Sequence, residues 1–144
     1  MSEPSGYRYS ERNPDTGATW PRMPEVLGAL AGAAAAEAGF PDFVPDACLV
    51  NRYLPGSQLT LHQDRHEQDV WAPIVSVSLG LRATFLFGGF ERGERPRRVA
   101  VHHGDVAVWG GVDRLRFHGV MPLERATHAI LGEQRLNLTF RKVR

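Results

Sequence analysis

The 144-residue chain contains a single cysteine, Cys48, so it cannot form an intramolecular disulfide or a metal site built on several thiolates. Scarce cysteine favours a reducing compartment, and the first residues show no basic-then-apolar leader, so we expect a cytoplasmic protein. The longest stretch of low polarity, residues 26–36, contains two glycines and is too short to span a bilayer. We therefore expect no contact with a membrane.

The chain also lacks a large net charge of either sign. The formal net charge of +1 indicates neither a nucleic acid nor an acidic partner by itself. Hydrophobic residues make up 42% and charged residues 23%, ordinary values for a folded globular protein, so extended disorder is excluded. We expect a partly flexible polar arm at residues 1–22 and one domain at residues 23–144. Nothing in the pattern indicates an obligate protein partner.

The apolar pattern predicts one helix followed by short strands. Residues 24–38 are alanine-rich, with Pro24 suited to a first helical turn and Gly39 to a stop. The expected apolar stripe of this helix consists of Val26, Leu27, Leu30, Ala33 and Ala34. Strands are expected at residues 47–54, 59–62, 74–80, 83–87, 99–101, 106–109, 117–120 and 135–141. Such strands with Gly and Pro turns favour a mainly β fold, a double-stranded β-helix (jelly roll) with a packing helix N-terminal to it.

The stretch His62-Gln63-Asp64 carries the first functional argument. Strand side chains alternate, so His62 and Asp64 can share one face. With a second, distant histidine they would form the two-histidine, one-carboxylate site that suits Fe(II). The triplet alone is a weak signal, because a chain with six histidines can carry it by chance. A histidine at a strand end followed by a solvated turn aspartate is the simpler alternative.

The last predicted strand, residues 135–141, carries the second argument. Its odd positions are polar and its even positions are apolar, so one face is expected to pack in the core. The simpler interpretation of the polar face is the solvated side of an edge strand. The alternative is that Arg135 and Arg141 bind the two carboxylates of a five-carbon diacid, one at each end. Guanidinium groups bind carboxylates in a bidentate manner, and the two Cα atoms would lie about 20 Å apart.

These motifs, together with residues 45–53, 72–80 and 103–105, resemble the AlkB family of Fe(II)/2-oxoglutarate-dependent nucleic-acid dealkylases, the alkylation repair dioxygenases. The similarity extends from Tyr7 to Arg141. The Fe(II) ligands that it implies are His62, Asp64 and His118. The 2-oxoglutarate pocket that it implies is formed by Asn51, Tyr53, Arg135, Asn137 and Arg141. The substrate contacts that it implies are Tyr7, Tyr9, His66 and Arg92.

The activity implied by the resemblance is oxidative demethylation of alkylated DNA bases, with RNA as a second candidate. The expected lesions are of the 1-methyladenine and 3-methylcytosine type. O2 and 2-oxoglutarate would be converted to succinate and carbon dioxide, and the methyl group would leave as formaldehyde. A base in a duplex must be flipped out to react. The family has an acidic residue where this chain has His66, which leaves the preferred lesion open.

Two alternatives from other functional classes remain. The same oxygenase chemistry could act on a protein or a small molecule, because a fold does not determine a substrate. A non-catalytic jelly-roll binding module is the other alternative, although it would have no use for Arg135 and Arg141. Two aromatic residues, Trp109 and Phe117, are expected in the core. The histidines expected in turns or on the surface are His102, His103 and His128.

Overall fold

The structure is a computed structural model, and it describes residues 12–65 and 70–144. Within these residues the helix α1 (Glu25–Glu37) precedes eight strands. The strands are β1 (Ala47–Tyr53), β2 (Leu59–His62), β3 (Ile74–Gly80), β4 (Ala83–Phe87), β5 (Arg97–Val101), β6 (Val106–Trp109), β7 (His118–Val120) and β8 (Arg135–Arg141). A short 3-10 helix, η1 (Gly111–Asp113), connects β6 to β7. All the predicted elements are confirmed, with boundaries that differ by at most two residues.

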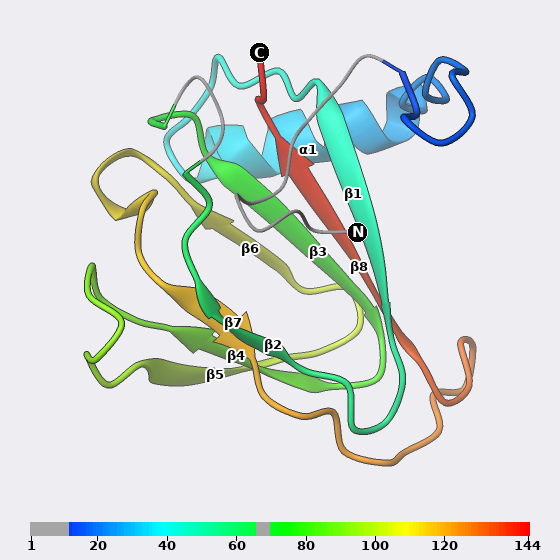
Figure 1. The fold of residues 1–144 in the computed structure, drawn as a ribbon, viewed down its shortest axis with the longest axis vertical. Helices are drawn as coiled ribbons and strands as arrows, with labels where there is room; N and C mark the ends of the chain where they lie inside the picture. Colours follow the sequence, from blue (N-terminus) through cyan, green and yellow to red (C-terminus); the bar gives the residue numbers. More distant parts are fainter. Residues whose placement is uncertain (1–11, 66–69) are drawn as a thin grey trace.

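The strands form two four-stranded antiparallel sheets that face each other (Figure 1). The first sheet has the order β1-β8-β3-β6 and the second has the order β2-β7-β4-β5. Except at the β4–β5 hairpin, successive strands lie in different sheets, which confirms the predicted jelly roll. Strand β8 lies between β1 and β3, so it is an interior strand. This position excludes the interpretation of β8 as an edge strand.

Helix α1 covers the outer face of the first sheet (Figure 1). Ala31 and Ala35 are fully buried there against Val75, Val77 and Phe140 of β3 and β8. Because strand side chains alternate, the neighbouring residues of β3 and β8 point the other way, into the space between the sheets. The helix therefore fixes which face of the first sheet is left for a site.

The buried side of α1 differs from the predicted stripe. Leu27 and Ala34 pack against the core as expected, but Val26 and Leu30 are 72% and 40% exposed, and Ala33 is also exposed. The helix carries Ala and Gly on every side, so its sequence pattern specifies the inward face only weakly. The sheet selects the alanines, because small side chains allow close approach.

The inner face of the first sheet is polar and buried. Four side chains of β8 that project between the sheets are at most 9% exposed: Arg135, Asn137, Thr139 and Arg141. Hydrogen bonds connect them to β3, with Asn137 Nδ2 donating to Ser76 Oγ at 2.8 Å. Thr139 Oγ1 in turn donates to Asn137 Oδ1 at 2.8 Å. Buried polar groups of this kind are held in place by their hydrogen-bond partners, so the orientation of the side chains on this face is fixed by the fold.

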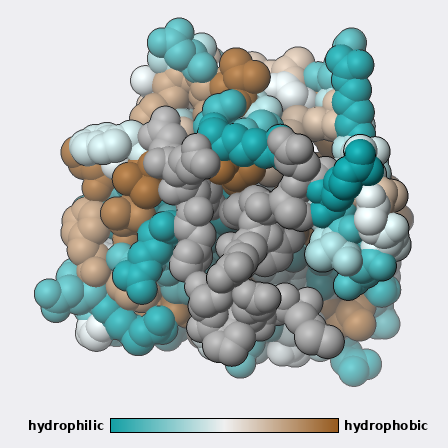
Figure 2. Space-filling model, turned by 45° about the horizontal axis from the view of Figure 1, so that its top comes forward, coloured by the Kyte–Doolittle hydropathy of each residue, from teal (hydrophilic) through white to brown (hydrophobic). Residues whose placement is uncertain are grey.

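No helix among the described residues is long and apolar enough to span a bilayer. The face shown in Figure 2 interleaves hydrophilic and hydrophobic residues. Exposed apolar side chains such as Val44, Trp71 and Ile130 come from separate loops.

Candidate active site

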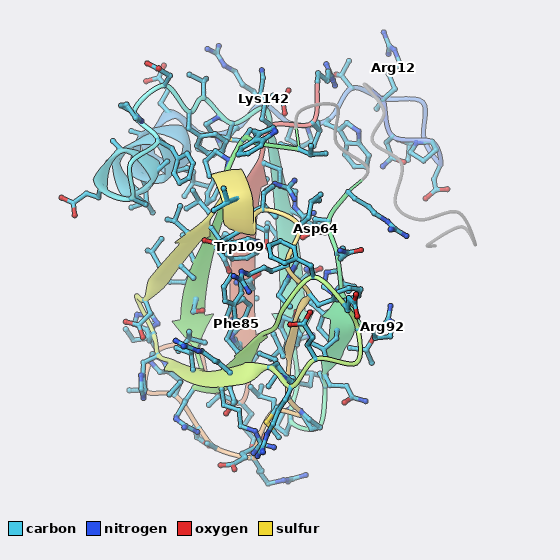
Figure 3. All side chains as sticks on the ribbon, turned by 90° about the vertical axis from the view of Figure 1, so that its left-hand side faces the viewer. Arg12, Asp64, Phe85, Arg92, Trp109 and Lys142 are labelled. Atoms are coloured by element: carbon cyan, nitrogen blue, oxygen red, sulfur yellow. The ribbon has the colours of Figure 1, made fainter. Side chains whose placement is uncertain are left out.

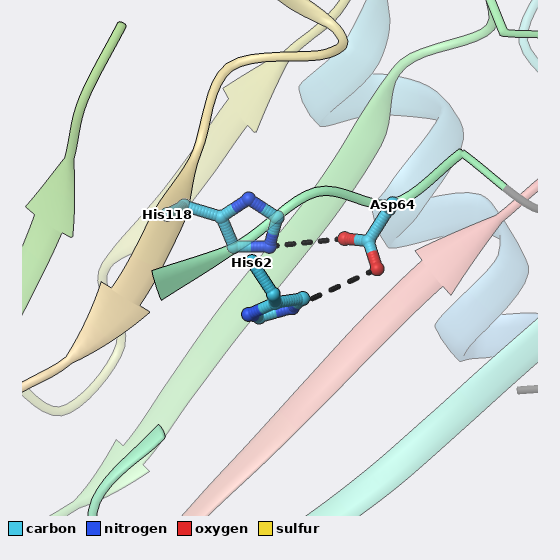
Figure 4. Close-up of side chains that lie close together, drawn as sticks. All are labelled: His62, Asp64 and His118. Carbon is cyan, nitrogen blue, oxygen red and sulfur yellow. Dashed lines mark ion pairs between the residues drawn. The ribbon is translucent and has the colours of Figure 1, made fainter. Parts of the chain in front are cut away.

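Three predicted ligands converge between the two sheets. His62 ends β2, Asp64 follows shortly after it, and His118 begins β7, where it is paired directly with His62. Their ligand-type atoms all lie within 4.8 Å of one another (Figure 4). His118 Nε2 is 2.9 Å from Asp64 Oδ2, and His62 Nε2 is 3.7 Å from Asp64 Oδ1. The pairing of β2 with β7 brings the distant histidine to the His-x-Asp motif.

The backbone fixes the orientation of both imidazole rings. His62 Nδ1 lies 2.9 Å from the Thr60 carbonyl oxygen, and His118 Nδ1 lies 3.3 Å from the Arg116 carbonyl oxygen. A carbonyl can only accept a hydrogen bond, so Nδ1 carries the hydrogen in each ring. Both Nε2 atoms therefore face the Asp64 carboxylate. Two nitrogens oriented in this way and one carboxylate oxygen fit a divalent cation such as Fe(II).

The charges around Asp64 favour its ionised form. Burial by itself raises the pKa of Asp64, but its contact with His118 and the charge of Arg141 hold it well below its usual range. Arg141 Nη1 lies 2.7 Å from Asp64 Oδ1. Burial and the neighbouring His118 lower the pKa of His62. A carboxylate and neutral imidazole are the forms that bind a metal ion.

A cavity of about 480 Å³ surrounds these side chains. It is lined by both sheets, through Leu49, Asn51, Tyr53, Leu59, His62, Asp64, Ser76, Phe85, Trp109, His118, Val120, Arg135, Asn137, Thr139 and Arg141. Figure 3 shows Asp64, Trp109 and Phe85 close together within the molecule, with Arg92 toward the outside. A larger depression of about 560 Å³ lies beside the loop after α1, but none of the three converging ligands reaches it. The smaller cavity is therefore the candidate active site.

Arg135 is the strongest test of whether this cavity fits a dicarboxylic acid. The residue is 2% exposed. Its guanidinium lies 5.0 Å from the centre of the Tyr53 ring and donates from Nη2 to Ser78 Oγ at 3.0 Å. Within the described part of the chain, its Nε and Nη1 atoms have no hydrogen-bond partner. Burial lowers the pKa of Arg135, and Tyr53 offsets this only in part. A buried guanidinium with two unsatisfied donors fits a carboxylate that arrives with a ligand.

The other residues predicted for the 2-oxoglutarate pocket line the same cavity. Asn51, Tyr53 and Asn137 lie around the same space as the three converging side chains. Arg141 lies at the end beside Asp64, and Arg135 belongs to the opposite end of β8. A diacid held between Arg135 and Arg141 stays a prediction.

Of the predicted substrate contacts, Arg92 alone falls within the described residues. Tyr7, Tyr9 and His66 lie outside the described residues. Arg92 is exposed in the β4–β5 connection, and its Nη1 donates to the Leu61 carbonyl oxygen at 2.6 Å. Its guanidinium also lies 5.0 Å from the centre of the Phe117 ring. Arg92 therefore contacts residues that directly precede His62 and His118.

Trp109 is buried, as expected for a core residue. Its side chain also lines the cavity, with its ring 4.9 Å from that of His118, which the sequence analysis did not predict. Its buried indole nitrogen has no hydrogen-bond partner among the described residues. Sequence reasoning also missed Ser76 and Phe85 as cavity residues. The serines that alternate along β3 were an available signal, whereas an aromatic residue within a strand produces the same pattern in a core and in a cavity wall.

His102, His103 and His128 do not line the cavity. His103 Nδ1 accepts a hydrogen bond from the Gly80 amide at 2.9 Å, and its ring centre is 4.5 Å from that of His128. His102 is exposed, and its Nδ1 lies 3.6 Å from Asp105 Oδ2. These contacts belong to turns, as the sequence predicted.

Gly119 allows β7 to approach β2 beside His118. A Cβ atom at this position would lie 2.6 Å from the Leu59 carbonyl oxygen and 3.2 Å from the Leu61 amide nitrogen. We expect Gly119→Ala to push the two strands apart, lowering the free energy of unfolding by about 1–3 kcal/mol and weakening Co(II) binding. Thermal unfolding with and without Co(II) measures both effects. Gly93→Ala is the control, since a Cβ there meets nothing within 4 Å. An unfolding temperature unchanged from wild type in Gly119→Ala would contradict this prediction.

The jelly roll contains two histidines and one carboxylate in the same cavity as a buried arginine that has unsatisfied donors for a carboxylate. This combination is typical of iron-dependent oxygenases that consume a 2-oxo acid. The sequence pattern of the 2OG-Fe(II) oxygenase superfamily matches residues 1–141, and the chain belongs to this family. Fe(II) and 2-oxoglutarate are the metal and the co-substrate of the family, as predicted.

The chain is similar to known members of this family. It is 53% identical over 137 residues to the alpha-ketoglutarate-dependent dioxygenase AlkB of Escherichia coli (strain K12), covering 95% of this chain and 63% of the relative. It is 41% identical over 98 residues to the nucleic acid dioxygenase ALKBH1 of Homo sapiens, covering 68% of this chain and 25% of that protein. The solved structure of OsALKBH1 matches with a TM-score of 0.81 and 34% identity, over 93% of this chain and 70% of that one. These similarities confirm the resemblance to the AlkB family, although the chain spans a little under two thirds of the Escherichia coli relative.

Proposed function

We propose that this chain catalyses oxidative demethylation of alkylated bases in DNA or RNA, of the 1-methyladenine and 3-methylcytosine type. The observation that carries the chemistry is the buried Arg135 guanidinium, with two unsatisfied donors, in the same cavity as the three converging ligands. The printed name of the human relative supports a nucleic acid as the substrate, because it is called a nucleic acid dioxygenase.

We assign each part of the proposed reaction to particular side chains of the cavity. His62, Asp64 and His118 would hold Fe(II), and Arg135 would pair with the distal carboxylate of 2-oxoglutarate. Arg141, beside Asp64, would assist at the other end of the co-substrate. When bound, Fe(II) and 2-oxoglutarate supply the oxidation, in which O2 is consumed, succinate and carbon dioxide leave, and a methyl C–H bond is hydroxylated.

The protein's own contribution is position, charge and exclusion of water. Arg141 balances the Asp64 charge, and the Tyr53 ring holds the Arg135 guanidinium in place. Apolar side chains from both sheets, Leu49, Leu59, Phe85 and Val120, line the remaining wall. Such a wall keeps bulk water away from the oxidised carbon and strengthens each ionic contact inside the cavity.

Nucleic acid would reach the cavity past the β4–β5 connection. Four arginines of this hairpin are exposed, namely Arg92, Arg95, Arg97 and Arg98. Exposed guanidinium groups bind phosphates, and the base must leave its stack to enter the cavity. Tyr7 and Tyr9 would stack on the extruded nucleotide.

Succinate release from 2-oxoglutarate tests this function. Fe(II) protein would be assayed with no oligonucleotide, with an unmodified oligonucleotide and with one carrying 1-methyladenine. We expect the methylated oligonucleotide alone to stimulate release, with formaldehyde formed in equal amount. Release that no oligonucleotide stimulates would favour a protein or small-molecule substrate. A protein that binds metal but releases no succinate under any condition would favour a binding module.

His66 is expected to set the preference among methylated bases. It replaces a carboxylate near the expected base pocket, and an imidazole offers a different hydrogen-bond pattern. We expect His66→Asp to change the ratio of activity on 1-methyladenine to that on 3-methylcytosine. Imidazole titrates near neutral pH, so the wild-type ratio should also vary between about pH 6 and 8. A ratio that neither the substitution nor pH alters would mean that His66 does not contact the base.

A further inference from the structure

Arg114 is a buried charged residue that the proposed reaction does not use. Its side chain is 1% exposed and is among the largest fully buried side chains of the described residues. Its Nε donates to the Ala72 carbonyl oxygen at 2.8 Å, and its Nη1 donates to the Asp64 carbonyl oxygen. The Arg114 guanidinium therefore binds the backbone at two places: at Asp64, a predicted metal ligand, and at Ala72.

Asp64 needs such a contact because no strand holds its backbone. Strand β2 ends at His62, so the ladder that positions His62 against His118 does not extend to Asp64. The direction of a side chain follows the backbone that carries it. A hydrogen bond to the Asp64 carbonyl is thus a means of aiming its carboxylate.

A second bond reinforces the same connection. Gln63 Nε2 donates to the Leu115 carbonyl oxygen at 2.8 Å. Gln63 lies between two predicted ligands, and Leu115 directly follows Arg114 in the segment that leads to His118. Two hydrogen bonds from side chain to backbone therefore connect the segment of Gln63 and Asp64 with the segment of Arg114 and Leu115. Neither bond belongs to a pair of strands.

The chemistry of arginine suits this role better than that of lysine. A guanidinium presents several donors in a rigid plane, so it can bind two carbonyl oxygens with fixed geometry. A lysine ammonium keeps the charge but not the planar fork. The Asp64 and Ala72 carbonyls would otherwise lose a charge-assisted partner in a buried place.

We infer that Arg114 is a positioning residue of the metal centre. It fixes the backbone of Asp64 so that the carboxylate faces His62 and His118, and it ties that point to Ala72. This inference rests on the proposed function, because it concerns the same metal centre. Groups that orient metal ligands typically affect metal affinity by about 10- to 100-fold.

The test compares Arg114→Lys and Arg114→Met with wild type by titration of Co(II), followed by its visible absorption, well below each unfolding temperature. We expect Arg114→Met to weaken Co(II) binding by about 10- to 100-fold and to change the shape of the Co(II) bands. Arg114→Lys should fold and show a smaller effect of the same kind. A purely structural role would lower the unfolding temperature of the metal-free protein without changing the Co(II) dissociation constant or spectrum.

Arg52→Met is the matched control. Arg52 also makes a long-range side-chain hydrogen bond, from Nε to Gln134 Oε1 at 2.6 Å, but it is exposed and contacts no predicted ligand there. Its variant should bind Co(II) as wild type does. If folded Arg114→Lys and Arg114→Met both bind Co(II) with wild-type affinity and spectrum, this inference is overturned and the proposed function stands. Should Arg114→Met fail to fold, Arg114→Lys decides alone. Wild-type protein that binds no Co(II) would overturn the proposed metal centre, and this inference with it.

Discussion

Arg135→Met is expected to weaken 2-oxoglutarate binding by roughly thirty-fold to several thousand-fold. Removing one partner of a buried, hydrogen-bonded charge pair costs on the order of 2–5 kcal/mol, largely because the other charge is left unpaired. Each tenfold change in affinity corresponds to about 1.4 kcal/mol. Arg135 meets the conditions for a large effect, since the residue is 2% exposed and two nitrogens of its guanidinium have no hydrogen-bond partner among the described residues.

Arg135→Lys separates the effect of the positive charge from the effect of the planar guanidinium geometry. Arg135→Lys keeps a positive charge but loses the planar pair of donors, so its affinity should lie between those of wild type and Arg135→Met. Fe(II) binding should change little in both variants, because Arg135 is not one of the converging ligands.

Anaerobic titration of 2-oxoglutarate into the Fe(II) protein measures this effect through the metal-to-ligand charge-transfer absorption. Arg98→Met, which removes an exposed guanidinium from β5, is the control and should bind the co-substrate as wild type does. Wild-type affinity in Arg135→Met would show that the distal carboxylate is held elsewhere. The diacid interpretation of β8 would then be wrong.

Strand positions were predictable because alternation and turn residues are local properties of the sequence. The pattern of β8 predicted one apolar and one polar face, and the structure has both. Whether the polar face meets water or a cavity depends on the sheet that lies opposite it. The second sheet lies over this face, and packing between strands far apart in the sequence is not a local property.

The residues of the site also divide into those that a local sequence pattern predicts and those that depend on the fold. His62 and Asp64 could be grouped from their spacing, while the resemblance to a family was needed to select His118 among the histidines. Trp109 was expected in the core and is buried, but its place in the cavity wall could not be predicted, because burial in a core and burial in a cavity wall produce the same apolar pattern. Arg114 left no signal at all, since its partners are backbone carbonyls that every residue type provides. Side-chain contacts to the backbone depend on the fold and not on the identity of the residue that is contacted.

His118→Ala is expected to abolish turnover and to reduce metal affinity by more than about a hundred-fold. Loss of a group that only orients a ligand typically costs about 10- to 100-fold, and a direct ligand should cost more. The variant leaves His62 and Asp64, and the Asp64 carboxylate keeps its ion pair with Arg141 at 2.7 Å. Two remaining ligands, one of them already paired with a guanidinium, offer a divalent cation a weak site.

The matched control is His103→Ala, because both histidines contact the backbone through Nδ1 and lie against a second imidazole ring. His103 lies away from the cavity, so its variant should retain metal binding and turnover even if the turn around Gly80 is destabilised. Mn(II) binding, followed by the loss of the free-ion electron paramagnetic resonance signal, measures the first effect, and succinate release measures the second. Circular dichroism establishes that each variant is folded. A folded His118→Ala protein that binds Mn(II) as tightly as wild type would exclude His118 as a ligand, and the contact between its Nε2 atom and Asp64 would then be a simple ion pair.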